Sequence, residues 1–561
     1  MGIDYDVVVI GSGAGGLTAA LCLAQAGQKV LVCEQHYVAG GWCHSFTLEG
    51  YRFSPGVHYI GGIGPGGHMR EIYEGLGVSR DLAFSEINPD GYDHILVGET
   101  GASAQRFDIP KGRAAYEEKL KARFPHESKG IAAFFEAVDS LPQELSRLAR
   151  LRGVVDVVKL PLTAPNAVRW AWRSGQAMLN HYVSDPFLKA VLAGQAGDHG
   201  MPLSLVSAPV HAGIIHHYFD GGYYPIGGGF AIPRAFVRAL KRAGGELRLE
   251  TRVERILLED GKAIGVRLGD GSEIRANTII SNADPEVTFG RLIGRENLSS
   301  RLQRKLDRVR YSVSALSLFV AVDMDLRAAG LDSGNYWFYA HNDLDGIYRQ
   351  GMTDEALRAE RVPAIFLTAT TLKDPSKMHS GHHTLEAFTF VGYDAFRKWA
   401  NEPSGQRGTS YQSLKERLID RMLARLDDLV PGFRDHVVFC DLGTPLTNQF
   451  YLEATAGNLY GIEKSRFQVG PGAFPTRGEI PGLYMVGAST LSHGVAGVTA
   501  SGLQAARQIL HCRTADLLQQ DGPALPIYPA EDISQWPDKL RRRIEQRQAT
   551  LAPEPEPEFV G

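Results

Sequence analysis

The sequence has few of the features that mark a secreted or nucleic-acid-binding protein. It contains five cysteines, an odd number with no Cys-x-x-Cys pair, so neither a disulfide framework nor a zinc site is expected and a reducing compartment fits. Acidic residues outnumber basic ones, 63 to 59, for a net charge of −4, whereas nucleic-acid-binding domains usually carry a basic surplus. We therefore expect no nucleic-acid partner, no bound metal and a cytoplasmic location.

Long hydrophobic runs and a basic leader are also missing. The opening residues, MGIDYDVVVI, have no basic stretch before the apolar run, so no secretory signal is expected. Asp6 stands where N-myristoylation needs Ser or Thr. Residues 7–28 carry no charge, but their glycine cluster and strand-then-helix rhythm favour a buried βαβ unit over a membrane span.

Glycine is what the sequence has in excess. It makes up 63 of 561 residues, above the usual ~7%, without a collagen-like repeat, so it indicates tight turns and close contacts between backbone and ligand. At ~100–200 residues per domain, a chain of this length is expected to form two to four domains. Hydrophobic residues at 44% and charged residues at 22% are typical of globular proteins.

A glycine-rich turn near the N-terminus joins a predicted strand to a predicted helix. Residues 7–10, Val-Val-Val-Ile, indicate a buried parallel strand. Residues 11–16 match G-x-G-x-x-G, and residues 17–26 have the small, apolar composition of a packed helix. A second strand is predicted at 29–33 and ends at Glu34, near the ~20-residue spacing expected for the acid of a dinucleotide site.

Each residue type in this unit has a physical role in binding a dinucleotide. Gly11 permits the tight turn, and Gly13 lets a pyrophosphate reach the N–H groups at the helix N-terminus. Gly16 lets the helix pack closely on the strand, and Glu34 accepts hydrogen bonds from ribose hydroxyls. Because strand, glycines, helix, second strand and acid agree, we interpret the unit as a dinucleotide site rather than an empty glycine loop.

The far end of the chain favours FAD over NAD. Residues 482–488 predict a short strand that ends in glycine, and residues 497–502 lead into a helix that reaches about residue 510. In two-domain FAD proteins, a late strand, glycine and helix of this kind place a second helix N-terminus near the flavin ring. Two halves of one site so far apart along the chain are unusual for an NAD dehydrogenase.

Further motifs, spread over residues 5–515, resemble one flavoprotein family. They are EQH at 34–36, AGGWCHSF at 39–46, GVHYIG at 56–61, GQAGDHG at 194–200, GGYYP at 221–225, SNADP at 281–285 and TPLT at 444–447. This set resembles the retinol saturases and the related carotenoid isomerases and phytoene desaturases. The resemblance implies FAD and a hydrophobic polyene, retinol-like or carotenoid-like, whose C=C bond is saturated by hydride transfer from reduced flavin. Isomerisation or desaturation with the same flavin stays open, as does, more remotely, a non-catalytic isoprenoid-binding escort.

The residues expected to hold FAD come from both ends of the chain and from one middle segment. In the family, the residue at Val253 meets the adenine through its backbone. The full set is Gly11, Gly13, Ala14, Gly15, Gly16, Glu34, Gln35, Gly40, Gly41, Trp42, Val253, Gly487, Ala488, Gly497 and Val498. NAD(P)H is a candidate electron donor. Residues 62–67 also match G-x-G-x-x-G, but they contain proline and precede no strand ending in an acid, so we do not assign them to NAD.

A proton donor is expected beside the flavin, because saturating a C=C bond needs one proton besides the hydride. His58 and Tyr59 follow the flavin-proximal motifs, and we predict that they act at the substrate. Further candidates are Asp198, His199 and His493.

Two other features favour structural roles. His216 and His217 are adjacent, but no third ligand stands at a metal-binding spacing. Cys43 has no cysteine near it in sequence, so packing is expected rather than redox chemistry.

The order of these segments predicts an α/β protein with a discontinuous, Rossmann-like FAD-binding domain and an α+β substrate domain on a mixed or antiparallel sheet. The predicted FAD domain comprises residues 1–75, 221–290 and 475–515, and the substrate domain 76–220 and 291–474. The tail, 516–561, is expected to be partly disordered, because residues 552–558 alternate Pro and Glu.

Individual elements follow from the local patterns. Predicted helices lie at 230–243, 411–430 and 538–550, predicted strands at 246–258, 274–281, 315–322, 364–370, 385–391 and 436–440, and a hairpin turn at 269–271.

One segment suggests contact with a membrane. Residues 145–175 combine six Lys or Arg with one Asp and carry apolar residues and two tryptophans. Such a composition is typical of an interfacial anchor on anionic lipid. An ordinary packed helix pair with a basic edge is the alternative.

Overall fold

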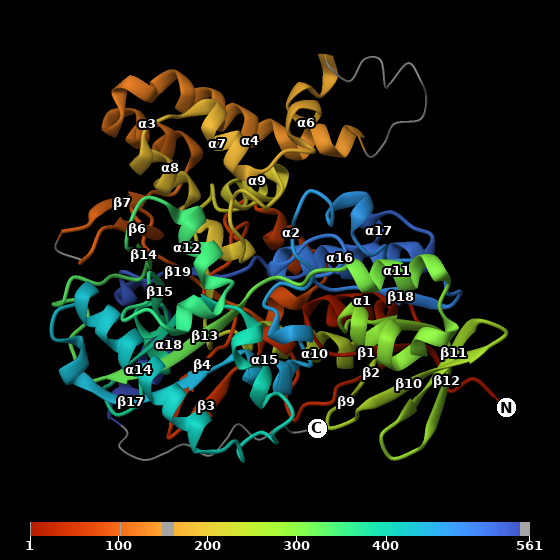
Figure 1. Ribbon diagram of the computed structural model, residues 1–561. Coiled ribbons are helices and arrows are strands. Elements are labelled where there is room, and N and C mark those ends of the chain that lie inside the picture. Colours follow the sequence, from red (N-terminus) through yellow and green to blue (C-terminus); the bar gives the residue numbers. More distant parts are fainter. Residues whose placement is uncertain (1, 101–102, 149–161, 550–561) are drawn as a thin grey trace.

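Two seven-stranded sheets and a group of helices make up the computed structural model, which describes residues 2–100, 103–148 and 162–549. Figure 1 shows the two sheets below the helical group. The predicted fold class, with a Rossmann-like unit and a mixed second sheet, is confirmed. The predicted domain boundaries stay predictions.

The first sheet contains the predicted dinucleotide-binding unit. Its parallel strands, in order across the sheet, are β18 (Leu483–Met485), β12 (Glu273–Ser281), β1 (Tyr5–Ile10), β2 (Val30–Cys33) and β9 (Glu246–Arg248). The antiparallel strands β11 (Lys262–Leu268) and β10 (Val253–Glu259) extend it from the first half of β12. Strand β1 reads as predicted, because its apolar residues are covered on both faces of the sheet.

Three helices cover this sheet: α1 (Ala14–Gln25), α10 (Ala231–Arg242) and α16 (Gly494–Leu510). Helix α1 is buried from Ala14 to Ala24, and it crosses α16 closely. A Cβ built on Gly502 of α16 would lie 2.4 Å from the carbonyl oxygen of Gly15. This crossing therefore requires small residues in both helices. Helix α16 begins three residues before the predicted position.

The predicted strand at 246–258 is wrong as a single element. The structure divides it into β9, which pairs with β2, and β10, which pairs with β11. Between them Glu250 has a positive φ of 50°, and the N–H of Thr251 donates to the carbonyl of Glu34. The alternating pattern continues across this turn, so sequence periodicity did not show the break. The predicted hairpin at 269–271 is confirmed between β11 and β12.

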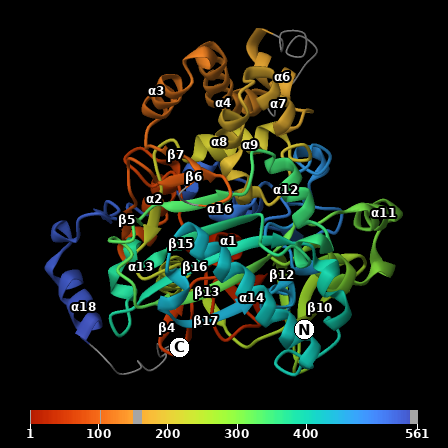
Figure 2. The same cartoon turned by 60° about the vertical axis from the view of Figure 1, so that its left-hand side comes forward.

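The second sheet has the order β17 (Val437–Gly443), β13 (Ser314–Val322), β16 (His383–Val391), β15 (Ala364–Ala369), β14 (Asn335–Tyr339), β6 (Asp93–Val97) and β7 (Gln105–Ile109). All neighbours are antiparallel except β14 and β6. The four strands predicted here, which became β13, β15, β16 and β17, are confirmed. Helix α14 (Thr409–Leu429), also predicted, packs against this sheet, as Figure 2 shows.

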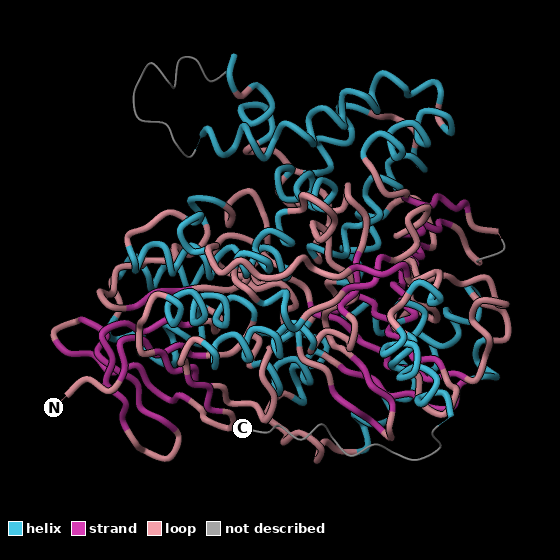
Figure 3. Tube along the Cα trace, turned by 180° about the vertical axis from the view of Figure 1, so that it is seen from behind, coloured by secondary structure: helices cyan, strands magenta, loops and turns pink. Residues whose placement is uncertain are grey.

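The helical group contains α3 (Arg113–Arg123), α4 (Ser128–Leu148), α6 (Pro165–Trp170), α7 (Gly175–Tyr182), α8 (Pro186–Ala193) and α9 (Ala208–His217). It stands above both sheets and is seen from behind in Figure 3. Much of the predicted membrane segment, residues 149–161, lies outside the described residues. In the described part, Trp170 is fully buried and Trp172 is 65% exposed. None of the described helices is both long and apolar enough to cross a bilayer.

The described part of the tail packs on the body of the protein. Strand β19 (Ile527–Pro529) pairs with β5 (Phe84–Glu86), which also pairs with β8 (Tyr223–Pro225). Trp536 is buried, and α18 (Asp538–Ala549) confirms the predicted charged helix. The Pro-Glu alternation at 552–558 lies outside the described residues.

Candidate active site

Two adjoining cavities lie where β1 and β2 end, which is where open α/β sheets bind ligands. The smaller has a volume of about 110 Å³ and the larger about 1000 Å³. Both are bordered by Gly13, Gly41, Asn282, Ala283 and Leu452. The pair therefore forms one continuous path from the end of β2 to the second sheet.

The residues predicted to hold FAD gather along this path. The smaller cavity is lined by Gly11, Gly13, Glu34, Gln35, Gly41 and Val253. The larger is lined by Gly13, Ala14, Gly15, Gly40, Gly41, Trp42, Gly487, Ala488, Gly497 and Val498. Gly16 borders neither cavity. A Cβ on Gly16 would lie 2.3 Å from the carbonyl oxygen of Gly11, so its role is to let α1 pack on the loop after β1.

Two helix N-termini reach the larger cavity without capping side chains. Helix α1 has Gly13 at its N-cap and α16 has His493; neither side chain caps its helix, and neither first turn contains an acid. Such N-termini present unsatisfied N–H groups and a positive dipole end. A Cβ on Gly13 would lie 2.5 Å from Nδ2 of Asn282, so only glycine keeps this space open. The residues fit the pyrophosphate and ring system of FAD.

The Glu34 carboxylate joins three segments of the smaller cavity. Its oxygens accept hydrogen bonds from the Ser12 N–H (2.8 Å), the Ser12 hydroxyl (2.5 Å) and the His36 N–H (2.9 Å). The Gly40 N–H donates in turn to the Ser12 hydroxyl at 3.0 Å. Among the described residues, only the His36 N–H donates to Oε1, so this oxygen keeps a lone pair for a ribose hydroxyl. Sequence reasoning missed Ser12, which occupies a variable position of the glycine motif.

Asn282 was also missed as a site residue. It follows β12 directly, its N–H donates to the carbonyl of Ile10 at 2.9 Å, and its side chain borders both cavities. A Cβ on Gly15 would lie 2.9 Å from Oδ1 of Asn282. The available signal was the SNADP motif placed at the end of a strand.

Tyr59, one of the two residues predicted at the substrate, borders the larger cavity and contacts two carboxylates, the buried Asp93 and the partly buried Asp198. Its hydroxyl oxygen lies 2.8 Å from Oδ2 of Asp198 and 3.0 Å from Oδ2 of Asp93. Its ring stacks on Tyr218 with centroids 4.3 Å apart. Burial raises the pKa of both carboxyls, and the nearby charge of Asp93 raises the pKa of Asp198 further. The pair is thus poised to hold a proton near neutral pH.

His58, the other predicted residue, borders the same cavity. Its Nε2 lies 3.3 Å from Oε2 of Glu386, and the other oxygen of Glu386 accepts the Ser54 N–H at 2.7 Å. The buried ammonium of Lys377 lies 3.8 Å from this carboxylate. The ring of His58 is therefore oriented by an acid that a lysine supports.

The remaining histidine candidates are held in structural contacts. His493 donates from Nε2 to the carbonyl of Asp198 at 2.7 Å, and burial lowers its pKa to about 3. His199 packs against His211, and burial lowers the pKa of His199. His217 accepts the Gly61 N–H at 3.0 Å.

Two sequence features receive a structural explanation. Burial raises the pKa of Cys43 to about 12, which keeps the thiol protonated, as a packing role requires. In the second glycine motif, the N–H groups of Gly62 and Gly64 donate to the carboxylate of Asp220 at 3.0 and 3.2 Å. A carboxylate of the chain thus stands where a phosphate would have to bind.

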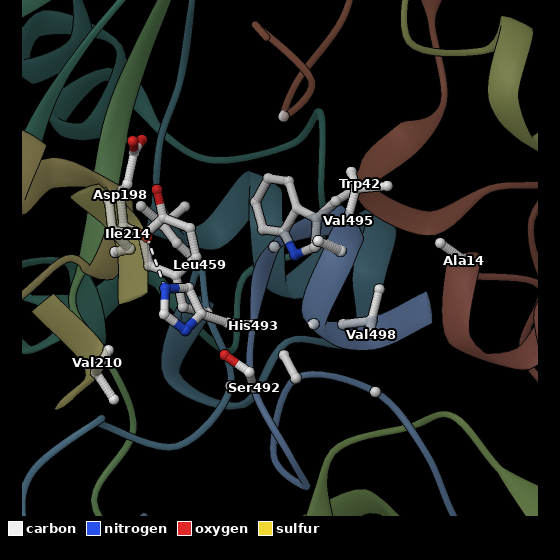
Figure 4. Close-up of a pocket in the computed structure, with 18 of the residues that line it drawn as sticks. Ala14, Trp42, Asp198, Val210, Ile214, Leu459, Ser492, His493, Val495 and Val498 are labelled. Atoms are coloured by element: carbon white, nitrogen blue, oxygen red, sulfur yellow. Dashed lines mark hydrogen bonds between the residues drawn. The ribbon is translucent and has the colours of Figure 1, made fainter. Parts of the chain in front are cut away.

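Figure 4 shows how the larger cavity is arranged. Asp198, Ile214, Leu459 and His493 lie on one side, Ala14 and Val498 lie on the other, and the ring of Trp42 stands between them. The far walls are apolar and include Phe366 and Phe388, whose rings stack 4.5 Å apart. We call the lining formed by Gly13, Gly15, Gly40 and Gly41 the glycine cradle. It opens directly into a cavity suited to a large apolar molecule.

Comparison with known proteins identifies the family. The model of the flavin containing amine oxidoreductases matches residues 14–510. The chain belongs to this family. It is a flavin-dependent oxidoreductase, as predicted.

Curated relatives of this flavin oxidoreductase agree with the predicted resemblance. All-trans-retinol 13,14-reductase of Danio rerio is 31% identical over 91% of the chain and 86% of the relative. Prolycopene isomerase of Daucus carota is 28% identical over 93% of the chain and 82% of the relative. An oxidoreductase of Methanosarcina mazei superposes with a TM-score of 0.59 at 19% identity, covering 89% of this chain and 99% of that one, which shows the shared fold.

Proposed function

We propose that the protein binds FAD along the two cavities and saturates a C=C bond of a hydrophobic polyene, retinol-like or carotenoid-like. The observation that carries this is the continuity of the glycine cradle with an apolar cavity of about 1000 Å³. The names of the relatives, a retinol reductase and a prolycopene isomerase, support the same substrate class.

Bound FAD would supply the electron pair of the reduction. The apolar walls, with Phe366, Phe388 and Leu459, would hold the polyene by burying its surface and would exclude water from the reacting bond. We assign His58 and Tyr59 to the substrate side of the cavity. Glu386 fixes the ring of His58, and two carboxylates fix the hydroxyl of Tyr59.

The first experiment is a visible spectrum of the purified protein, followed by anaerobic reduction and addition of all-trans-retinol and a carotenoid panel. Bound flavin and a product heavier by two hydrogens support the proposal. Bound flavin with an isomer of unchanged mass makes the chain an isomerase instead, and a product lighter by two hydrogens makes it a desaturase. A colourless protein that cannot be reconstituted with FAD would contradict the enzymatic proposal. Reduction by NADH or NADPH, compared with dithionite, tests the electron donor.

A cavity variant separates substrate binding from flavin binding. Gly213 of α9 borders the larger cavity, and a Cβ there meets nothing within 4 Å. Gly213→Leu should raise KM for the polyene and leave the flavin spectrum unchanged. Gly478→Leu is the matched control, because Gly478 is equally uncrowded and borders neither cavity. Equal KM values in the two variants would contradict the assignment of the cavity.

We further propose that the cavity mouth contacts an anionic membrane surface. Trp172 lines the cavity and is 65% exposed, and Phe467, beside the cavity-lining Arg466, is 70% exposed. Exposed aromatic side chains beside arginines are typical of interfacial contact. Trp172→Ala should weaken sedimentation of the protein with phosphatidylserine vesicles. Both the variant and the parent protein should bind only weakly to phosphatidylcholine vesicles. Equal sedimentation of the variant and the parent protein would contradict the contact.

A further inference from the structure

We propose that Asp198 is the acid that protonates the polyene, and that Tyr59 relays protons to it from Asp93. This inference rests on the proposed function and assigns a proton path within it. In the sequence, Asp93 stands 34 positions after Tyr59 and Asp198 stands 139 positions after it.

The geometry around Tyr59 requires a shared proton. The phenol has one O–H group, yet its oxygen lies within hydrogen-bonding distance of a carboxyl oxygen on each side, 2.8 Å from Asp198 and 3.0 Å from Asp93. Both contacts are hydrogen bonds only if one carboxyl is protonated and donates to the phenol oxygen. The three groups therefore form a chain of two acids bridged by one hydroxyl.

The other partners of the two acids decide which one carries the proton. Asp93 also accepts hydrogen bonds from Gln195 (2.7 Å), Asn335 (3.0 Å) and Trp337 (3.2 Å). Three neutral donors stabilise its ionised form. In the described part of the chain, the Asp198 side chain has a hydrogen bond only with Tyr59. The proton therefore belongs on Asp198, and the Tyr59 hydroxyl donates to Asp93.

The surroundings of Asp198 agree with this assignment. The titratable groups that face it are Tyr59, Asp93, Tyr218, Tyr339, Tyr348 and Tyr460. Among these groups only Asp93 is anionic at neutral pH, and none is a cation. Burial, followed by the charge of Asp93, raises the pKa of Asp198. Lys373, with its ammonium 2.5 Å from Oδ1 of Asn335, lies on the Asp93 side of the chain.

The backbone fixes Asp198 relative to the cofactor cradle. A Cβ on the preceding Gly197 would lie 2.1 Å from the ring of Trp337, so this turn is packed against the second sheet. On the other side, His493, the N-cap residue of α16, donates to the carbonyl of Asp198. Asp198 also borders the larger cavity, as Figure 4 shows. The acid is thus held between the second sheet and the helix that borders the flavin site.

The proton and electron balance is complete with the reduced flavin of the proposed function as two-electron reductant. The π bond breaks as one carbon gains a hydride and its neighbour gains the Asp198 proton, leaving two new C–H bonds and an Asp198 carboxylate. A proton that comes ultimately from bulk water and reaches Asp93 then passes to the phenol oxygen, while the phenol proton moves to Asp198. No net change remains in the three residues.

The test combines infrared spectroscopy with kinetics on the flavin-loaded protein. At pH 7 the parent protein should show a protonated-carboxyl band that Asp198→Asn removes. Asp108→Asn is the matched control. Burial opposes ionisation of Asp108, but hydrogen bonds from His94 and Arg106 hold its pKa well below the usual range. Asp108 is therefore already ionised at pH 7, and the band should persist in this variant. With bound flavin unchanged, Asp198→Asn should lower kcat by about 10²- to 10⁴-fold. In the parent protein, activity should fall as pH rises through the pKa of Asp198.

Tyr59→Phe tests the relay, because it keeps both acids and removes the bridge. It should slow turnover and shift the pKa of the Asp198 carboxyl, as read from its infrared band, whereas a merely structural Tyr59 would leave that pKa unchanged. An unchanged band in Asp198→Asn, or a kcat within about twofold of the parent protein, would overturn the proposal. If the parent protein binds flavin but forms no saturated product, the proposed function fails first, and the infrared result then stands alone.

Discussion

The close packing of Gly16 against the loop after β1 provides a quantitative prediction for the affinity of FAD. A Cβ on Gly16 would lie 2.3 Å from the carbonyl oxygen of Gly11, whereas carbon and oxygen in close contact are normally about 3.3 Å apart. Because the obstacle is backbone, Gly16→Ala must move α1 by about 1 Å relative to the loop. That movement displaces the first-turn N–H groups, and a lost hydrogen bond to a charged group costs about 1.5–3 kcal/mol. The Kd for FAD should therefore rise about 10- to 100-fold.

The assay is a titration of apoprotein with FAD, followed by flavin fluorescence. Gly478→Ala is the control, because its Cβ would meet nothing within 4 Å, and its Kd should equal that of the parent protein. Circular dichroism of the Gly16→Ala apoprotein checks that the fold survives the expected loss of about 1–3 kcal/mol. A Gly16→Ala protein that binds FAD within threefold of the parent would refute the role given to the contact between α1 and the loop.

Two further predictions concern stability. Trp170→Ala should lower the free energy of unfolding by about 3–5 kcal/mol because the side chain is fully buried, whereas Trp172→Ala should change it by less than about 0.5 kcal/mol; equal values in urea unfolding would contradict the placement of these rings. Burial lowers the pKa of Lys464 to about 7, so between this value and the unfolded pKa the unfolded chain binds one more proton. Stability should rise by about 1.4 kcal/mol per pH unit from this group, and Lys464→Met should lose that rise in urea unfolding at pH 7, 8 and 9. Parallel curves of unfolding free energy against pH for the parent protein and Lys464→Met would contradict this prediction.

Sequence reasoning recovered the features whose signal is local. The glycine motif, the flanking strands and helix α1 follow from a contiguous pattern, and long apolar runs marked β13 and β16. It missed β6, whose sequence Asp-His-Ile-Leu-Val begins with two polar residues that are nonetheless buried. Two of their partners, Asn335 and Asp332, stand more than 200 positions away, so no local pattern could show that these polar groups are satisfied.

The same limit applies to the site. Tyr59 and Asp198 were each named as candidates, but nothing in the sequence placed them within 2.8 Å of one another. Asp93 was not named, because its function depends on donors from β14 and from the turn after α8. The cofactor residues were easier to list, since backbone N–H groups and glycines act in contiguous stretches, whereas a proton path depends on single side chains brought together by the fold.

The order of segments in the first sheet has a consequence for synthesis of the protein. Strand β1 and helix α1 leave the ribosome first. The strand β12, which pairs with β1, follows some 250 residues later, and α16, which covers α1, follows α1 by roughly 480 residues. At about 5–20 residues per second, α1 waits on the order of 25–100 s for α16. During that interval an uncovered strand edge and an apolar helix are exposed, and the second half of the flavin site does not exist. FAD can therefore be captured only after α16, which begins about the last eighth of the chain, has emerged, so its supply can affect the yield of folded protein only from the end of translation onward.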